Sequence, residues 1–159
     1  MPLQSSVTWI DGMALEASLD GHTFNLDADA EFGGRDRGPR PKGLLVTSLI
    51  GCTALDVIAI LGKMRVPMKG LQVSATADLA AEHPKTVQRI EVRYQFTGDD
   101  LPPAKLRRAV QLSEERYCGV RATLAPVVTM TSSIWVNGER LPEDQATLEG
   151  DVADLASTG

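Results

Sequence analysis

The chain has 159 residues, the size of one domain, because two separate units within this length would each be too small for a stable core. Hydrophobic residues make up 43% and charged residues 23%, a balance that excludes an intrinsically disordered chain. Aromatic residues make up only 4% and the formal net charge is −5, so we expect an aliphatic core and no binding to nucleic acid.

The first predicted elements are three short strands within residues 7–26. Apolar and polar residues alternate in three runs, and the Asp-Gly pairs at 11–12 and 20–21 between the runs are typical of tight hairpin turns. The loop that follows, over 27–42, is rich in glycine, proline and charge, and its end is basic. We therefore expect a β-meander and then a long surface loop.

The longest apolar segment, Leu44 to Leu61, predicts a helix over about 42–65, with Pro41 suited to its first turn. This segment is barely long enough to cross a bilayer, and Asp56 near its middle would be costly in lipid. We expect no membrane span, but a helix that is buried on nearly every side, partly beneath a second subunit.

The beginning of the chain, MPLQSSVTWIDG, has neither the basic nor the apolar segment of a secretory signal. This pattern predicts a cytoplasmic location. In the cytoplasm thiols are kept reduced, which makes a cysteine pair more often catalytic than structural.

The second half of the chain predicts two strands, a helix and a further strand. Alternating apolar residues indicate a hairpin over 71–79 and 90–96. Apolar residues at helical spacing from Leu106 to Tyr117 predict a helix that stops near Gly119, and a last strand is expected over 128–136. The order βββ-α-ββ-α-β predicts an α+β fold, because strands cluster instead of alternating with helices.

The formal charge lies entirely at the end of the chain. Residues 1–138 hold equal numbers of acidic and basic residues, whereas 139–159 hold six acidic residues against Arg140 alone. We expect a single domain over 1–138 and an acidic tail over 139–159 that is mobile or loosely docked.

The chain has two cysteines, Cys52 in the apolar helix and Cys118 at the end of the second helix. They form no C-x-x-C motif, and together with His22 and His83 they match no common zinc spacing, so we expect no metal and no cofactor. From composition alone, lone cysteines are more often inert core residues than reactive thiols.

The residues around Cys52 favour chemistry at its sulfur. Gly51 leaves space beside the thiol, and Asp56 lies one helical turn further on the same face. A buried carboxylate needs a partner, and two alternatives stay open at this point. Asp56 forms a structural ion pair, or it orients an arginine towards the sulfur of Cys52.

Two segments carry a resemblance to a known family. GLLVTSLIGCTALDVIAILGKMR, preceded by Pro41, and LSEERYCGVRATL together resemble the OsmC/Ohr family. The likeness is greatest to a less characterised OsmC-like branch, which carries a G-C-[ST]-x-x-D-V-x-x-I-L-x-K-like helix and a Y-C turn. The similarity extends from the meander to Val136, and the two segments are specific in combination.

The resemblance implies an intertwined homodimer with two long helices at its centre. It also implies a thiol peroxidase that reduces small apolar organic hydroperoxides, in which Cys52 becomes a sulfenic acid and Cys118 resolves it as a disulfide. An external dithiol such as a lipoyl group then reduces the disulfide. A place for Cys118 at a helix C-terminus would disfavour its thiolate and fit the resolving role, whereas a new turn that starts there would reverse this argument.

The sequence departs from the family pattern in the groups that activate the thiol. Well-studied peroxidases have a glutamate directly after the proline that opens the cysteine helix, but here Lys42 and Gly43 follow Pro41. The activating arginine comes from the N-terminal strands, yet residues 1–34 contain no lysine or arginine. We hypothesise that a nearby basic residue replaces it, held by Asp56; the candidates are Arg35, Arg37 and Arg40. The alternative is that these three arginines form a solvated loop.

Three functions are therefore open. The first is the thiol peroxidase. The second is an OsmC-like binding or structural dimer that has lost turnover, as the missing glutamate and strand arginine would favour. The third is a redox sensor whose disulfide alters a partner interaction.

Overall fold

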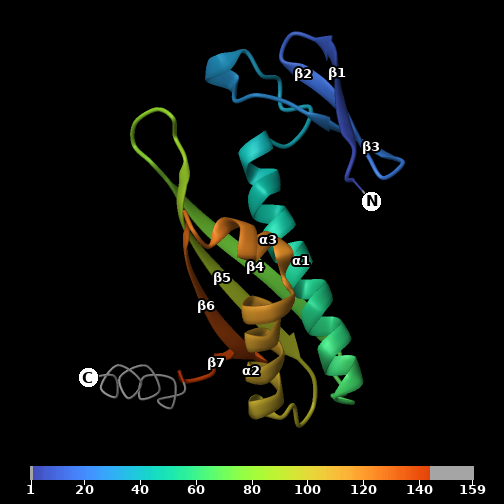
Figure 1. The fold of residues 1–159 in the computed structure, drawn as a ribbon, viewed down its shortest axis with the longest axis vertical. Helices are drawn as coiled ribbons and strands as arrows, with labels where there is room; N and C mark the ends of the chain where they lie inside the picture. Colours follow the sequence, from blue (N-terminus) through green and yellow to red (C-terminus); the bar gives the residue numbers. More distant parts are fainter. Residues whose placement is uncertain (1, 144–159) are drawn as a thin grey trace, which may run out of the picture.

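The computed structural model describes residues 2–143, which form two separate sheets and a layer of helices (Figure 1). The helical elements are the 3-10 turn Ala30–Phe32, α1 (Pro41–Lys63), α2 (Pro103–Leu112), a π-helical segment (Ser113–Tyr117) and α3 (Gly119–Leu124). The strands are β1 (Ser5–Asp11), β2 (Ala14–Leu19), β3 (His22–Leu26), β4 (Gly70–Leu79), β5 (Val87–Thr97), β6 (Thr129–Val136) and β7 (Glu139–Arg140). The α+β class and the order of the main elements are as the sequence predicts.

The N-terminal strands form the expected meander, with antiparallel sheet order β1-β2-β3. Gly12 and Gly21 adopt positive φ in the two turns, a conformation that glycine takes without strain. Figure 1 shows this sheet beyond the N-terminal end of α1, away from the other strands. Every residue of β1 is exposed in the single chain, including Trp9 at 68%.

The loop between β3 and α1 is held by buried Asp27, whose carboxylate accepts the backbone N–H groups of Ala28, Arg35 and Arg37 at 2.8–3.0 Å. These hydrogen bonds, the one from Arg37 foremost, lower the pKa of Asp27. The loop is therefore an ordered connection between β3 and α1.

The second sheet has the order β4-β5-β6-β7. The predicted hairpin is confirmed: β4 and β5 pair antiparallel, with Val73 opposite Tyr94. Strand β6 pairs parallel to β5, so the chain must cross over between them, and the α2–π–α3 segment makes this crossover. Short β7, which the sequence pattern did not predict, pairs with the end of β6.

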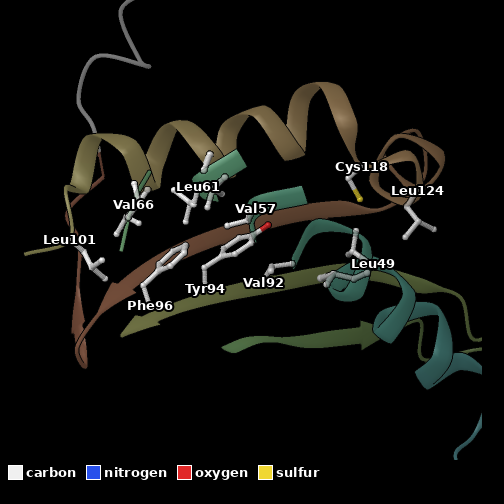
Figure 2. Packing of buried hydrophobic residues seen from close by; sticks show 14 of the residues in the cluster. Leu49, Val57, Leu61, Val66, Val92, Tyr94, Phe96, Leu101, Cys118 and Leu124 are labelled. Carbon is white, nitrogen blue, oxygen red and sulfur yellow. The ribbon is translucent and has the colours of Figure 1, made fainter. Parts of the chain in front are cut away.

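One face of this sheet carries the core. Alternate β5 residues Ile90, Val92, Tyr94 and Phe96 are almost fully buried. Figure 2 shows Val92, Tyr94 and Phe96 within this core. Helix α1 contributes one buried face to the same core, made of Leu49, Thr53, Val57 and Leu61. The helical spacing of these four residues is what an amphipathic stripe requires.

The remaining faces of α1 are open in the single chain. The expectation that α1 is buried on nearly every side included cover by a second subunit and stays a prediction; in the single chain Leu55 is 71% exposed and Ile58 is 47% exposed. By length and composition alone α1 could cross a membrane. However, its buried stripe packs on a sheet and includes Thr53, whose hydroxyl is hydrogen-bonded within the core.

The second predicted helix is not continuous. It ends as an α-helix at Leu112, continues as a π-helical turn and is replaced by α3 after Cys118. Gly119, which the sequence pattern marks as a helix stop, is instead the first residue of the next helix. Of the acidic tail predicted over 139–159, residues 139–143 are described and include β7, and the rest lies outside the described residues.

Candidate active site

Helix α1 presents Cys52 and Asp56 on one side, one turn apart, as the spacing predicts. Both residues are half-buried. Gly51 has open space around its Cα, since no atom lies within 4 Å of where a Cβ would stand. The position directly before Cys52 on α1 is therefore open.

The π-helical segment turns Cys118 into the core. The backbone N–H of Cys118 donates to the carbonyl of Ser113 at 2.8 Å, an i to i−5 bond that accommodates one extra residue in the turn. As a result, Tyr117 is 57% exposed while Cys118 is 3% exposed. Figure 2 shows the Cys118 side chain directed inward from this end of the helical layer.

The two sulfurs and one carboxylate meet at this point. The Sγ atoms of Cys52 and Cys118 and a carboxylate oxygen of Asp56 all lie within 4.8 Å of one another. Both cysteines are free thiols. An S–S bond is about 2.0 Å long, so a shift of at most about 3 Å would join them.

Cys118 begins a helix, which corrects the expectation that it ends one. Its backbone is extended, and its Sγ accepts the backbone N–H of Arg121 at 3.4 Å as the N-cap of α3. This contact alone would favour the thiolate. Burial has the larger effect, and with the nearby Cys52 and Asp56 it raises the pKa of Cys118 to about 11. Cys118 therefore remains a neutral thiol near pH 7.

A buried chain of hydroxyl groups supports the site. Ser113 donates its hydroxyl to Asp56 at 2.9 Å and lies 2.8 Å from the hydroxyl of Thr53, which is 2.7 Å from that of Tyr94. Tyr94 in turn donates to Glu114 at 3.2 Å. Burial raises the pKa of Tyr94, so its hydroxyl stays protonated as a donor.

Glu114 ends this hydroxyl chain in an ion pair. Its carboxylate lies 3.5 Å from the Arg121 guanidinium, and both side chains are less than one-fifth exposed. Because Glu114 follows Ser113 and Arg121 belongs to α3, the pair joins the π-helical segment to the helix that Cys118 caps.

Two of the three arginines proposed as activators have other side-chain partners in the single chain. Arg37 forms a bidentate pair with Asp11, at 2.7 and 2.9 Å. Arg40 pairs with Asp29 at 2.9 Å and with Asp36 at 2.6 Å. Arg35 contributes its backbone N–H to Asp27. Within residues 2–143 none of them forms an ion pair with Asp56, and their activating role stays a prediction.

Sequence reasoning placed Cys52, Cys118 and Asp56 in the site but missed the residues that hold them. Thr53, Tyr94 and Ser113 are polar side chains at core-facing positions of otherwise apolar stripes. That mismatch is a signal for a buried hydrogen-bonded group. Among residues 2–143, neither His22 nor His83 belongs to a cluster of potential metal ligands.

A family model described as OsmC-like protein matches residues 33–133 of the chain. The chain belongs to the OsmC-like protein family. Its α1, its two cysteine segments and the β4–β5 hairpin all lie within this match. The resemblance seen in the two cysteine segments is thereby confirmed.

A curated relative supports the same membership. Protein YhfA of Escherichia coli (strain K12) is 33% identical over 132 residues, which cover 82% of this OsmC-like chain and 96% of the relative. Its name states no activity.

Solved structures share the OsmC-like fold. A hypothetical protein from Aquifex aeolicus VF5 is 24% identical, with a TM-score of 0.77 over 86% of this chain and 97% of its own. An organic hydroperoxide resistance protein OsmC from Legionella pneumophila is 16% identical, with a TM-score of 0.66 over 86% of this chain and 98% of its own. At these identities the likeness shows the fold alone.

Proposed function

We propose that this OsmC-like protein is a thiol peroxidase that reduces organic hydroperoxides. The observation that carries the proposal is the convergence of two free thiols within 4.8 Å from distant parts of the chain. A family that includes organic hydroperoxide resistance proteins supports the choice of substrate. Cys52 lies on an otherwise largely apolar helix, and such surroundings favour an apolar peroxide over hydrogen peroxide.

The proposed cycle has three balanced steps. The Cys52 thiolate attacks the peroxide, the O–O bond breaks, and one proton is taken up to give a Cys52 sulfenic acid and an alcohol. The Cys118 thiol then attacks the sulfenic sulfur, forming the disulfide and releasing water. An external dithiol, such as a lipoyl group, returns both thiols and leaves as its own disulfide.

The division of roles follows from burial. Cys118 is 3% exposed and has a raised pKa, so it is neither accessible to a peroxide nor ionised near pH 7. Cys52 is half-buried on α1 and is the thiol that a small molecule can reach. The Cys118 thiol lies beside Cys52 and attacks the Cys52 sulfur only after that sulfur has become a sulfenic acid. A resolving cysteine requires this order of steps.

We propose that the active form is a homodimer, as the family resemblance implies. The single chain leaves uncovered the outer face of α1 and the apolar side chains of the meander sheet; these include Leu55, Ile58, Val7, Trp9 and Phe24. Apolar surface of this extent on a small protein marks an interaction face. A second copy would cover it and could bring a basic residue towards Cys52.

Arg35 is the least restrained of the three proposed activators. Its guanidinium makes no hydrogen bond or ion pair within residues 2–143, whereas those of Arg37 and Arg40 are held by carboxylates of their own loop. We therefore expect Arg35→Ala to slow peroxide reduction, with Arg37→Ala as the matched control on the same loop.

A cytoplasmic location, where thiols stay reduced, completes this proposal.

Peroxide consumption with a dithiol reductant tests the function. The reduced protein should turn over cumene hydroperoxide faster than hydrogen peroxide, Cys52→Ser should abolish turnover, and Cys118→Ser should stop it after one round. If the wild type and Cys52→Ser consume cumene hydroperoxide equally slowly, the peroxidase proposal is wrong.

A second candidate function, a binding or structural dimer without turnover, is favoured by one observation. Within residues 2–143 no lysine or arginine side chain forms an ion pair with Asp56 or a hydrogen bond with either sulfur. A thiol without a cationic neighbour is a slow nucleophile. Equally slow consumption of cumene hydroperoxide by the wild type and Cys52→Ser in the assay above would support this function.

A further inference from the structure

The cluster of Cys52, Asp56 and Cys118 has the composition of a metal site. It offers two sulfur atoms and one carboxylate oxygen, all within 4.8 Å of one another. Two thiolates and a carboxylate suit a thiophilic divalent cation of the Zn²⁺ type, which accepts sulfur and oxygen ligands in tetrahedral geometry. A cluster of this spread needs only a small contraction to surround one ion.

The backbone presents the three ligands as metal sites usually do. Cys52 and Asp56 come from one helix face, four residues apart, and Cys118 arrives from a turn that is fixed by the π-helical bond to Ser113. The hydroxyl of the same Ser113 donates to Asp56 at 2.9 Å and fixes the direction of the carboxylate. Such outer partners orient ligands and strengthen metal binding.

The local charge also favours a cation. Each of the three groups is negative when ionised, and within residues 2–143 no lysine or arginine side chain pairs with any of them. The Arg121 guanidinium forms its ion pair with the Glu114 carboxylate instead. On the loop before α1, Arg37 is held by Asp11, and Arg40 is held by Asp29 and Asp36.

We propose that the reduced protein binds one Zn²⁺ per chain through Cys52 Sγ, Cys118 Sγ and the Asp56 carboxylate. The fourth position faces the half-exposed side of Cys52 and is filled by water. Binding releases the two thiol protons. Because the ion needs both thiolates, metal binding and the Cys52–Cys118 disulfide exclude each other, and a bound ion protects the thiols from peroxide.

Metal titration tests this inference without any peroxide, so its outcome is independent of peroxidase activity. Reduced protein is titrated with Zn²⁺ against a chromogenic chelator, and with Co²⁺ for the sulfur-to-cobalt charge-transfer absorption. We expect one ion per chain in the wild type and none after the disulfide has been formed chemically.

Three variants test the carboxylate ligand: one changes the ligand itself, one removes its hydroxyl partner, and one is a control. Asp56→Asn should weaken Zn²⁺ binding at least about tenfold, Ser113→Ala should weaken it about 10-fold to 100-fold, and Asp78→Asn on β4 should leave it unchanged. Far-UV circular dichroism shows that each variant is folded. Equal affinity in wild type and Asp56→Asn, or equal binding by reduced and disulfide forms, would overturn the proposal.

Discussion

Thr53 and Ser113 decide how the two cysteine segments meet. Thr53 belongs to the helix of Cys52, and Ser113 begins the turn that carries Cys118. Their hydroxyls lie 2.8 Å apart, and both side chains are almost fully buried. Each also has a second partner, so the contact is part of a hydrogen-bonded chain between two carboxylates. These two hydroxyls therefore fix the position of the Cys52 segment relative to the Cys118 segment.

Thr53→Val keeps the shape of the side chain and removes its hydroxyl. We expect the free energy of unfolding to fall by about 1–3 kcal/mol, because hydrogen bonds to two buried partners are lost. Chemical denaturation measures this change. The control is Thr123→Val, at an exposed position of α3, with an expected change within about 0.5 kcal/mol. Equal effects of the two substitutions would contradict the role given to the buried hydroxyls.

Cys118 makes the stability of the reduced protein fall at high pH. Its pKa is raised from 9.0 to about 11, so the unfolded chain loses this proton at a lower pH than the folded chain. The free energy of unfolding should therefore decline as pH rises through this window. The measurement is chemical denaturation of the reduced protein at several pH values. Cys118→Ala should show a shallower decline, and identical slopes would show that burial does not perturb the thiol.

Among single residues, the sequence indicated the cysteines and the carboxylate of the candidate site but not the hydroxyl groups that hold them. Cys52 and Asp56 stand out because a thiol and a carboxylate interrupt an apolar helix. Tyr94 alternates with apolar neighbours on β5 as any core aromatic would, and its pairing with Thr53 depends on how α1 crosses the sheet. A contact between residues so far apart in the chain is set by packing, which periodicity does not describe.

The π-helical segment is the element that builds the site. Residues Leu106 to Tyr117 follow helical spacing closely enough to predict one helix, because a π turn adds a single residue and barely changes the pattern. That one residue decides the geometry of the candidate site, since the turn leaves Tyr117 exposed and Cys118 buried. Regular elements were predictable from alternation and caps, whereas this local insertion was not.

Deletion of Glu115 should convert the π turn to a regular α turn. Cys118 would then rotate away from Cys52, and the yield of the disulfide between them after oxidation should drop several-fold. Disulfide yield is measured by gel mobility of alkylated protein. Glu115→Ala, which keeps the length of the turn, serves as the control and should form the disulfide normally. Normal disulfide formation in the deletion variant would contradict the role of the π turn.

At the scale of the whole molecule, the single chain leaves apolar surface uncovered on two elements. The meander sheet lies at one end of α1, away from the core of the second sheet, and α1 keeps an apolar face outward (Figure 1). Exposed apolar surface of this kind marks interaction faces, and the proposed homodimer would cover both elements. The sequence predicts that a second subunit covers part of α1, since the helix is apolar on all sides. It does not predict which face of the helix stays open in the single chain.

Leu55→Glu tests this assembly. In an isolated chain, a charge at a residue that is 71% exposed should change stability by no more than about 0.5 kcal/mol. In a dimer built on α1 it should dissociate the subunits, because the charge would be buried without a partner. Light scattering after gel filtration gives the mass. The control is Val127→Glu, at an exposed residue in the turn before β6, which should stay dimeric.

The pairing of Cys52 with Cys118 is tested most directly by peptide mapping of the reduced protein after one equivalent of cumene hydroperoxide. Mass spectrometry should find the two cysteine peptides joined by a disulfide within one chain, while Cys118→Ser should accumulate the Cys52 sulfenic acid. Two free thiols after treatment, or Cys52 joined only to a different chain, would contradict the account.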